Sequence, residues 1–155
     1  MRIRALIVDD EALARERVRM LLRDESDVEI VEECANGLEA IAAIEKESPD
    51  LMFLDVQMPE VDGFGVLQRI APEKLPVVIF TTAYDQHALR AFDAHALDYL
   101  LKPFKPSRFK EAVQRAREQI TNKQAGAAAR GLLNLLAERP APANTYLSRL
   151  TVKTP

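Results

Sequence analysis

The sequence has little of several features that mark particular protein classes. Cys34 is the only cysteine among the 155 residues, which excludes an intrachain disulfide and a zinc site built from thiolates. No apolar run approaches the roughly 20 residues that a membrane helix needs, and acidic residues follow the first apolar run too soon for a signal peptide. A net charge of −3 lacks the basic surplus that is usual in nucleic-acid-binding domains. Together these absences predict a soluble protein of the cytoplasm.

What the sequence does contain is a regular alternation of short apolar runs and amphipathic helical patterns. The β-like runs lie at about 3–8, 28–34, 51–55, 77–80 and 99–101, and a helical pattern follows each of them. Repeated βα units imply parallel strands joined by right-handed crossovers. The sequence therefore predicts an α/β fold, a doubly wound, five-stranded parallel sheet of flavodoxin-like order 2-1-3-4-5 with helices on both faces.

Each expected helix has one apolar side that should pack on this sheet. In the first helix, at about 12–22, we expect Leu13 on the apolar side and Arg15 mostly outward, as with the arginines at 17 and 19. The apolar residues of the five helices are, in order, Leu13, Val18, Leu21 and Leu22; Leu38, Ile41 and Ile44; Val66, Leu67 and Ile70; Ala88, Leu89 and Phe92; and Phe109, Ala112, Val113, Ala116 and Ile120.

The residues after about 122 differ in composition from the rest. The stretch 125–137 is rich in alanine and leucine, which predicts a helix, and the prolines at 140 and 142 end it. The stretch 146–154 has the pattern of a strand that begins a second module. We therefore expect an α/β domain over 1–122, a helical and proline-containing linker over 123–145, and the start of another domain over 146–155.

Residues with carboxylate, hydroxyl or amino groups lie at the ends of four of the predicted strands. Strands one and three are neighbours at the switch point of such a sheet, so Asp9, Asp10 and Asp55 should meet in one crevice. Crowded carboxylates repel one another unless a cation neutralises them, and Mg²⁺ suits them because it takes oxygen ligands. Asp55 could then attack phosphorus as a carboxylate nucleophile. Lys102 and the Thr82 hydroxyl would face the charge on the transferring oxygens.

Each of these residues also has an ordinary structural explanation. Asp9 and Asp10 could cap the first helix, and Asp55 could be a turn residue at the end of a strand. Thr82 could be a helix cap, and Lys102 could be a solvated lysine. Independent causes explain poorly why all of them fall at one edge of the sheet. The convergence favours a Mg²⁺-assisted phosphoryl acceptor.

Five motifs resemble, in order and approximate spacing, the receiver domains of two-component response regulators over about 1–120. They are Val8-Asp9-Asp10-Glu11, Leu54-Asp55-Val56-Gln57-Met58-Pro59, Asp62-Gly63, Thr82-Ala83 and Lys102-Pro103-Phe104. The resemblance implies a phosphoacceptor switch that takes its phosphoryl group from a histidine kinase and controls a transcription regulator. It is not an enzyme in the usual sense, although it promotes its own Mg²⁺-dependent phosphoryl transfer and hydrolysis.

The resemblance also implies a role for each site residue. Asp55 is the phosphoacceptor, and Asp9, Asp10, Asp55 and the backbone carbonyl of Gln57 hold Mg²⁺. Lys102 and Thr82 contact the phosphoryl group, and the bond between Lys102 and Pro103 is cis. Tyr99 is the switch residue whose rotamer follows Thr82, and it acts on a surface that includes the helix at 85–92. Gln57 and Tyr84 are expected to flank the acyl phosphate.

Two further stretches indicate a subfamily. Residues 10–17, and residues 80–85 with 91–92, resemble receivers of LytTR-type (LytR/AlgR-like) transcription regulators, in which an all-β DNA-binding domain follows. Residues 150–153 resemble its opening strand, so DNA would be bound only through a domain that is missing here. We expect a homodimer, because symmetric regulators suit paired DNA half-sites. The leucines at 132, 133, 135 and 136 could add to the dimer interface, or could pack loosely on their own domain.

Three other protein classes share part of this pattern. A phosphatase of the haloacid-dehalogenase type would place its nucleophile two residues before its acid partner after the first strand, whereas here the acids are adjacent. A nucleotide-binding Rossmann domain needs a glycine-rich first turn, which residues 9–12 lack. A phosphorylation-independent pseudo-receiver is the more serious alternative. Such modules usually lack an acid or the lysine, and this chain has all of them.

Overall fold

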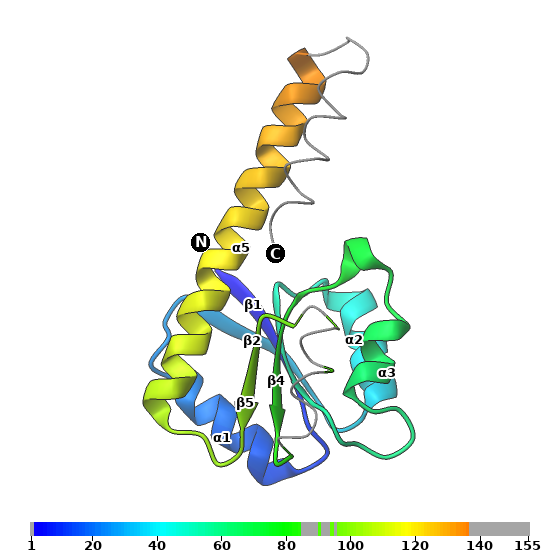
Figure 1. The fold of residues 1–155 in the computed structure, drawn as a ribbon, viewed down its shortest axis with the longest axis vertical. Helices are drawn as coiled ribbons and strands as arrows, with labels where there is room; N and C mark the ends of the chain where they lie inside the picture. Colours follow the sequence, from blue (N-terminus) through cyan, green and yellow to red (C-terminus); the bar gives the residue numbers. More distant parts are fainter. Residues whose placement is uncertain (1, 85–89, 91–93, 95, 137–155) are drawn as a thin grey trace. The chain divides into compact units, whose positions relative to one another are not determined.

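The computed structural model in Figure 1 describes residues 2–84, 90, 94 and 96–136. By its internal contacts the chain divides into two units, Met1–Ile120 and Thr121–Pro155. Three predicted features lie outside the described residues: the helix around 88–92, the break at prolines 140 and 142, and the strand at 146–154. Within the described part, no helix is both long enough and apolar enough to cross a membrane.

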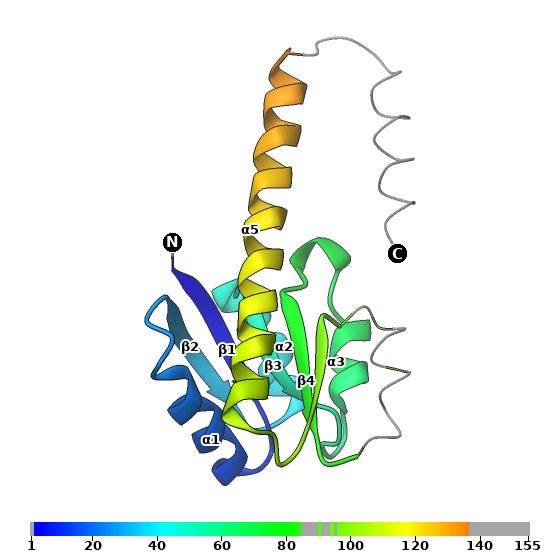
Figure 2. The same cartoon turned by 60° about the vertical axis from the view of Figure 1, so that its left-hand side comes forward.

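Five parallel strands form the centre of the first unit (Figures 1 and 2). They are β1 (Ile3–Val8), β2 (Val28–Cys34), β3 (Leu51–Asp55), β4 (Val77–Thr82) and β5 (Asp98–Leu101). Their order, β2-β1-β3-β4-β5, confirms the predicted topology. Every residue of β3 and β4 is buried, as expected for central strands that are covered on both faces.

Helices cover both faces of this sheet, which was also predicted. They are α1 (Ala12–Leu22), α2 (Gly37–Glu47), α3 (Gly63–Gln68), the short 3-10 helix η1 (Pro72–Lys74) and α5 (Pro106–Leu136). The core under α1 and α5 includes Ile7, Val18, Leu22, Phe53, Phe109, Ala112, Val113 and Ala116. The core under α2 and α3 includes Leu6, Ala40, Ile44, Leu54, Phe64, Val66 and Phe80.

The beginning of α1 differs from the prediction. Leu13, expected in the core, is 80% exposed. Leu13 lies about 140° around the helix from Val18, one of the two buried residues of α1, so its side chain points away from the sheet. Arg15, expected to point outward, is partly buried and reaches back to the loop before the helix, where it donates to the Asp9 carbonyl.

The third helix is shorter than its apolar pattern suggested. It ends at Gln68, so Ile70 lies outside it, although Ile70 is buried as expected. Gly63 and Gly65 lower the helix propensity of a segment of only six residues. Pro72 follows closely and begins η1, which leaves no room for another helical turn.

The last helix is longer than predicted. The fifth predicted helix, whose apolar residues run from Phe109 to Ile120, and the helix predicted at 125–137 form one uninterrupted helix, α5. Residues 121–124 join them without glycine or proline, so nothing in the sequence breaks the hydrogen-bond pattern. The predicted stripe from Phe109 to Ile120 is buried. The side chains of the leucines at 132, 133, 135 and 136 lie outside the described part.

Candidate functional site

Three carboxylates meet at the carboxyl end of the sheet. Val8 pairs with Leu54, so Asp9, the residue after β1, lies beside Asp55 at the end of β3. Asp10 follows Asp9, and carboxylate oxygens of all three residues lie within 4.8 Å of one another. Asp9 and Asp55 are 3% and 5% exposed, whereas Asp10 is open to solvent. Neither Asp9 nor Asp10 is the N-cap of α1, which is Glu11 without a side-chain cap.

The crowding of negative charge changes the acidity of Asp55. Burial and the nearby charge of Asp9 raise the pKa of Asp55 to about 7, with a smaller contribution from Asp10. Lys102 and the backbone N–H of Gln57 act in the opposite direction and do not compensate. In the metal-free cluster Asp55 therefore keeps its proton to a much higher pH than an ordinary aspartate does. A donor set made only of oxygens with excess negative charge fits a hard divalent cation such as Mg²⁺.

Lys102 enters this cluster from the β5–α5 loop. Its Nζ lies 2.7 Å from Asp9 Oδ2 and 3.9 Å from Asp55 Oδ1. It also lies 3.9 Å from Glu11 Oε1, a carboxylate that the sequence did not single out. With 20% of its side chain exposed, Lys102 is not the solvated lysine of the structural explanation. The bond to Pro103 is cis, as the resemblance implied.

Thr82 and two tyrosines lie on the other side of Asp55. Thr82 is fully buried at the end of β4, and its Oγ1 accepts the backbone N–H of Tyr84 at 3.3 Å. The backbone N–H of Lys102 donates to the Thr82 carbonyl at 2.6 Å, which joins the ends of β4 and β5. The hydroxyl of Tyr99, on β5, donates to the Tyr84 carbonyl. Thr82 and Tyr99 are thus connected through Tyr84.

The loop after β3 approaches Asp55 closely. Asp62 is the N-cap of α3, and its carboxylate accepts the Gly65 N–H at 2.8 Å. Gly63 donates its N–H to the Val56 carbonyl at 2.8 Å. A Cβ at Gly63 would lie only 2.6 Å from the Asp55 carbonyl oxygen. Glycine is therefore required where α3 begins, and this contact helps to hold the end of β3.

Substitution of Gly63 by alanine should show the importance of this contact. The added methyl group would meet backbone, which cannot move aside, so we expect Gly63→Ala to lower the free energy of unfolding by about 1–3 kcal/mol. Urea denaturation measures this change. Gly126→Ala is the control, because a Cβ at Gly126 meets nothing within 4 Å and should stabilise α5 by up to about 1 kcal/mol. A Gly63→Ala variant as stable as the original would contradict the argument.

The structure also brings Arg15 to the site, although the helical pattern predicted that this side chain would point mostly outward. The Arg15 guanidinium donates to the Asp9 carbonyl at 2.7 Å. Spacing could have indicated this contact, because side chains on a helix lean towards its N-terminus. An arginine in the first turn of α1 can therefore reach the loop that contains Asp9 and Asp10.

Comparison with known proteins identifies the family. Residues 5–114 match the model of the response regulator receiver domain. The chain belongs to this family. It is a receiver domain of a two-component response regulator, and relatives of this receiver are transcriptional regulatory proteins.

Two curated relatives and two solved structures illustrate the similarity. The transcriptional regulatory protein BtsR of Salmonella typhi is 49% identical over 117 residues, which are 76% of this chain and 49% of that protein. BtsR of Escherichia coli strain K12 is 47% identical over the same shares of both chains. The receiver domains of AraT from Geobacillus stearothermophilus and mrkE from Klebsiella pneumoniae are 37% and 32% identical, each with a TM-score of 0.71. The matches cover 80% and 77% of this chain and 99% of each of those chains. This chain spans about half the length of the curated relatives it matches.

Proposed function

We propose that this receiver takes a phosphoryl group from a sensor histidine kinase onto Asp55, with Mg²⁺, and thereby controls a transcription regulator. The observation that carries the proposal is the convergence of Asp9, Asp10 and Asp55 with Lys102 among them. That set combines a nucleophile, an oxygen-lined cation site and a fixed positive charge. A cytoplasmic location is part of the proposal.

The chemistry assigned to Asp55 is a displacement at phosphorus. A carboxylate oxygen of Asp55 forms the new P–O bond as the P–N bond to the donor histidine breaks, and the bonding electrons leave with the imidazole nitrogen. Mg²⁺ held by Asp9, Asp10, Asp55 and the Gln57 carbonyl would offset the negative charge of the carboxylates and the phosphoryl oxygens.

The protein's own groups then stabilise the transferred phosphoryl group. Lys102 is close enough to Asp9 and Asp55 to exchange one of these partners for a phosphoryl oxygen. The hydroxyl hydrogen of Thr82 is not needed for the bond that its oxygen accepts from Tyr84, so it can be donated to a phosphoryl oxygen. A movement of Thr82 would be passed to Tyr99 through Tyr84, which is the proposed switch.

Hydrolysis of the acyl phosphate belongs to the same proposal. Gln57, two residues after Asp55, and Tyr84, two residues after Thr82, are both exposed beside the site. We place them as the residues that limit the access of water to the acyl phosphate.

Labelling with acetyl phosphate, with and without Mg²⁺, tests the proposal. Labelling that requires Mg²⁺ would support a phosphoacceptor. A pseudo-receiver, the alternative, would bind its partners without being labelled under either condition.

The output and domain organisation are proposed on the resemblance and the relatives. The relatives are transcriptional regulatory proteins about twice as long as the matched segment. We propose that residues 1–122 are the receiver, 123–145 a linker and 146–155 the start of a LytTR-type domain. DNA would be bound through that domain.

A homodimer is the state that we propose for signalling. The continuous helix α5 carries the chain beyond the receiver to Leu136, and its leucine-rich end could pair with that of a second copy. Phosphorylation should strengthen the receiver contact. Sedimentation of the full chain and of a version that ends at Asn122, each with and without beryllofluoride as an acyl-phosphate mimic, measures both contributions. We expect beryllofluoride to promote dimers, more strongly in the full chain. Monomers under every condition at high concentration would rule the dimer out for this segment.

A further inference from the structure

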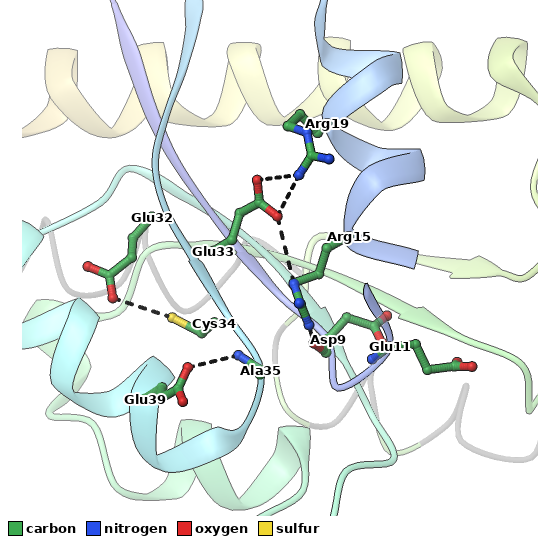
Figure 3. Close-up of polar contacts among 9 residues, drawn as sticks. All are labelled: Asp9, Glu11, Arg15, Arg19, Glu32, Glu33, Cys34, Ala35 and Glu39. Carbon is green, nitrogen blue, oxygen red and sulfur yellow. Dashed lines mark hydrogen bonds and ion pairs between the residues drawn. The ribbon is translucent and has the colours of Figure 1, made fainter. Parts of the chain in front are cut away.

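The loop that contains two of the three carboxylates is held by contacts at four atoms of Asp9. Its backbone N–H donates to the Cys34 carbonyl of β2 at 3.0 Å. Its Oδ1 accepts the Glu11 N–H at 3.0 Å, and its Oδ2 accepts Lys102 Nζ at 2.7 Å. The fourth contact is to its carbonyl oxygen, which accepts the Arg15 guanidinium at 2.7 Å. Figure 3 shows Arg15 directed from α1 towards Asp9.

The guanidinium of Arg15 is oriented from its other side by β2. Arg15 Nε lies 3.7 Å from Glu33 Oε1, and only 21% of the Arg15 side chain is exposed. Glu33 also forms an ion pair with Arg19, whose NH1 lies 2.9 Å from Glu33 Oε1 and 2.7 Å from Glu33 Oε2. Glu33 therefore stands between two arginines that are one turn apart on α1, and only Arg15 touches the Asp9 loop (Figure 3).

The contact to the Asp9 carbonyl has a consequence for Asp10. The Asp9 carbonyl and the Asp10 N–H belong to one planar peptide group. A hydrogen bond that holds the carbonyl therefore sets the orientation of the whole plane and the position of the Asp10 Cα, so that only rotation about the Asp10 N–Cα bond is left to direct its Cβ. Asp9 is buried and held at its own side chain, whereas Asp10 is exposed. The orientation of the Asp10 carboxylate therefore depends more on this backbone contact than that of Asp9 does.

From this geometry we propose that Arg15, supported by Glu33, is a positioning residue for the divalent cation: it holds the Asp9–Asp10 peptide so that the Asp10 carboxylate faces Asp55. The proposal rests on the function proposed above, in which these carboxylates hold Mg²⁺. Arg15 itself touches neither the cation nor the phosphoryl group.

Positioning and simple electrostatics predict opposite effects of removing Arg15. A guanidinium close to a cation site repels the cation, so a neutral replacement would by charge alone tighten Mg²⁺ binding. If Arg15 positions Asp10, a neutral replacement instead weakens binding, because the carboxylate is no longer held in place. The sign of the change therefore separates the two roles.

The test is calorimetric titration of the full chain with MgCl₂. We expect Arg15→Gln to weaken Mg²⁺ binding about tenfold, the size usual for residues that orient metal ligands. The rate of labelling by acetyl phosphate should fall at low Mg²⁺ and approach the original rate at saturating Mg²⁺. Arg19→Gln is the matched control, since it removes an ion pair from the same glutamate on the same helix without a contact to the loop. It should bind Mg²⁺ as the original does.

Circular dichroism in EDTA shows whether each variant folds. If Arg15→Gln does not fold, Arg15→Lys serves instead, because it keeps the charge but lacks the planar fork that reaches Asp9 and Glu33 together. It should also weaken binding. A folded Arg15 variant that binds Mg²⁺ as tightly as the original, or more tightly, would overturn the positioning role. Failure of the original protein itself to bind Mg²⁺ or to be labelled would instead overturn the proposed function.

Discussion

Asp55→Asn is expected to abolish covalent phosphorylation of this receiver. An amide is a far weaker nucleophile than a carboxylate and cannot form the acyl phosphate. In the unmodified protein, EDTA should have the same effect, because the dianionic phosphoryl group would meet the negative charge of Asp9, Asp10 and Asp55 without a divalent cation to offset it. Incubation with labelled acetyl phosphate, followed by measurement of the incorporated phosphate, gives the stoichiometry in each case.

A control aspartate shows that the loss is specific to the site. Asp24 is exposed in the turn after α1, at the opposite end of that helix from Asp9 and Asp10, and Asp24→Asn should be labelled like the original protein. Labelling of Asp55→Asn at unchanged stoichiometry would mean that another residue accepts the phosphoryl group. Labelling that persists in EDTA would remove the role proposed for the cation.

The same substitution is expected to stabilise the metal-free protein at neutral and higher pH. Burial and the Asp9 charge oppose ionisation of Asp55, so an uncharged side chain of the same shape relieves both. Full conversion of the shift, from 3.8 to about 7, at about 1.4 kcal/mol per pKa unit gives about 4 kcal/mol. We expect the free energy of unfolding to rise by less than this, on the order of 2 kcal/mol, because the asparagine is still buried and Lys102 loses a partner.

The pH dependence of this gain follows from the direction of the pKa shift. Asp55 has a higher pKa in the folded protein than in the unfolded chain, so the folded state binds more protons between about pH 4 and 7. The stability of the unmodified protein therefore loses a contribution as the pH rises through that range. The advantage of Asp55→Asn should be small near pH 4, grow up to about pH 7 and then stay constant.

Urea denaturation in EDTA at several pH values measures this advantage. Mg²⁺ should reverse the order at neutral pH, because it binds the folded unmodified protein more tightly than the variant and stabilises it by mass action. An Asp55→Asn variant that is less stable than the original in EDTA at pH 8 would show that the carboxylates do not strain the fold.

The fold could be predicted because its signals are local and repeated. Central strands such as β3 are buried on both faces and read as continuous apolar runs, and the crossover rule then leaves few possible topologies. Predictions failed where burial depends on the position of a residue relative to the sheet. Leu13 is apolar, but it lies about 140° around α1 from the buried Val18, on the side that faces away from the sheet. The junction at 121–124 has no breaker, and only the structure shows one helix there.

Chain order alone is enough to predict which chemical groups reach the carboxyl edge of the sheet. Each of Asp9, Asp55, Thr82 and Lys102 directly follows or ends a strand, and parallel strands all end on the same side. That reasoning needs only chain order and strand direction, so it required no coordinates.

How these groups are held and charged depends on the packing of segments that are distant in the chain. The raised pKa of Asp55 depends on its burial and on its distance from Asp9, neither of which is encoded in spacing along the chain. The contacts of Lys102 with Asp9 and of Arg15 with the Asp9 carbonyl join segments through side-chain rotamers. Strand direction sets where a backbone ends, but a long side chain can adopt many rotamers there. Packing of α1 against β2 selects one of them for Arg15 and brings it to the site.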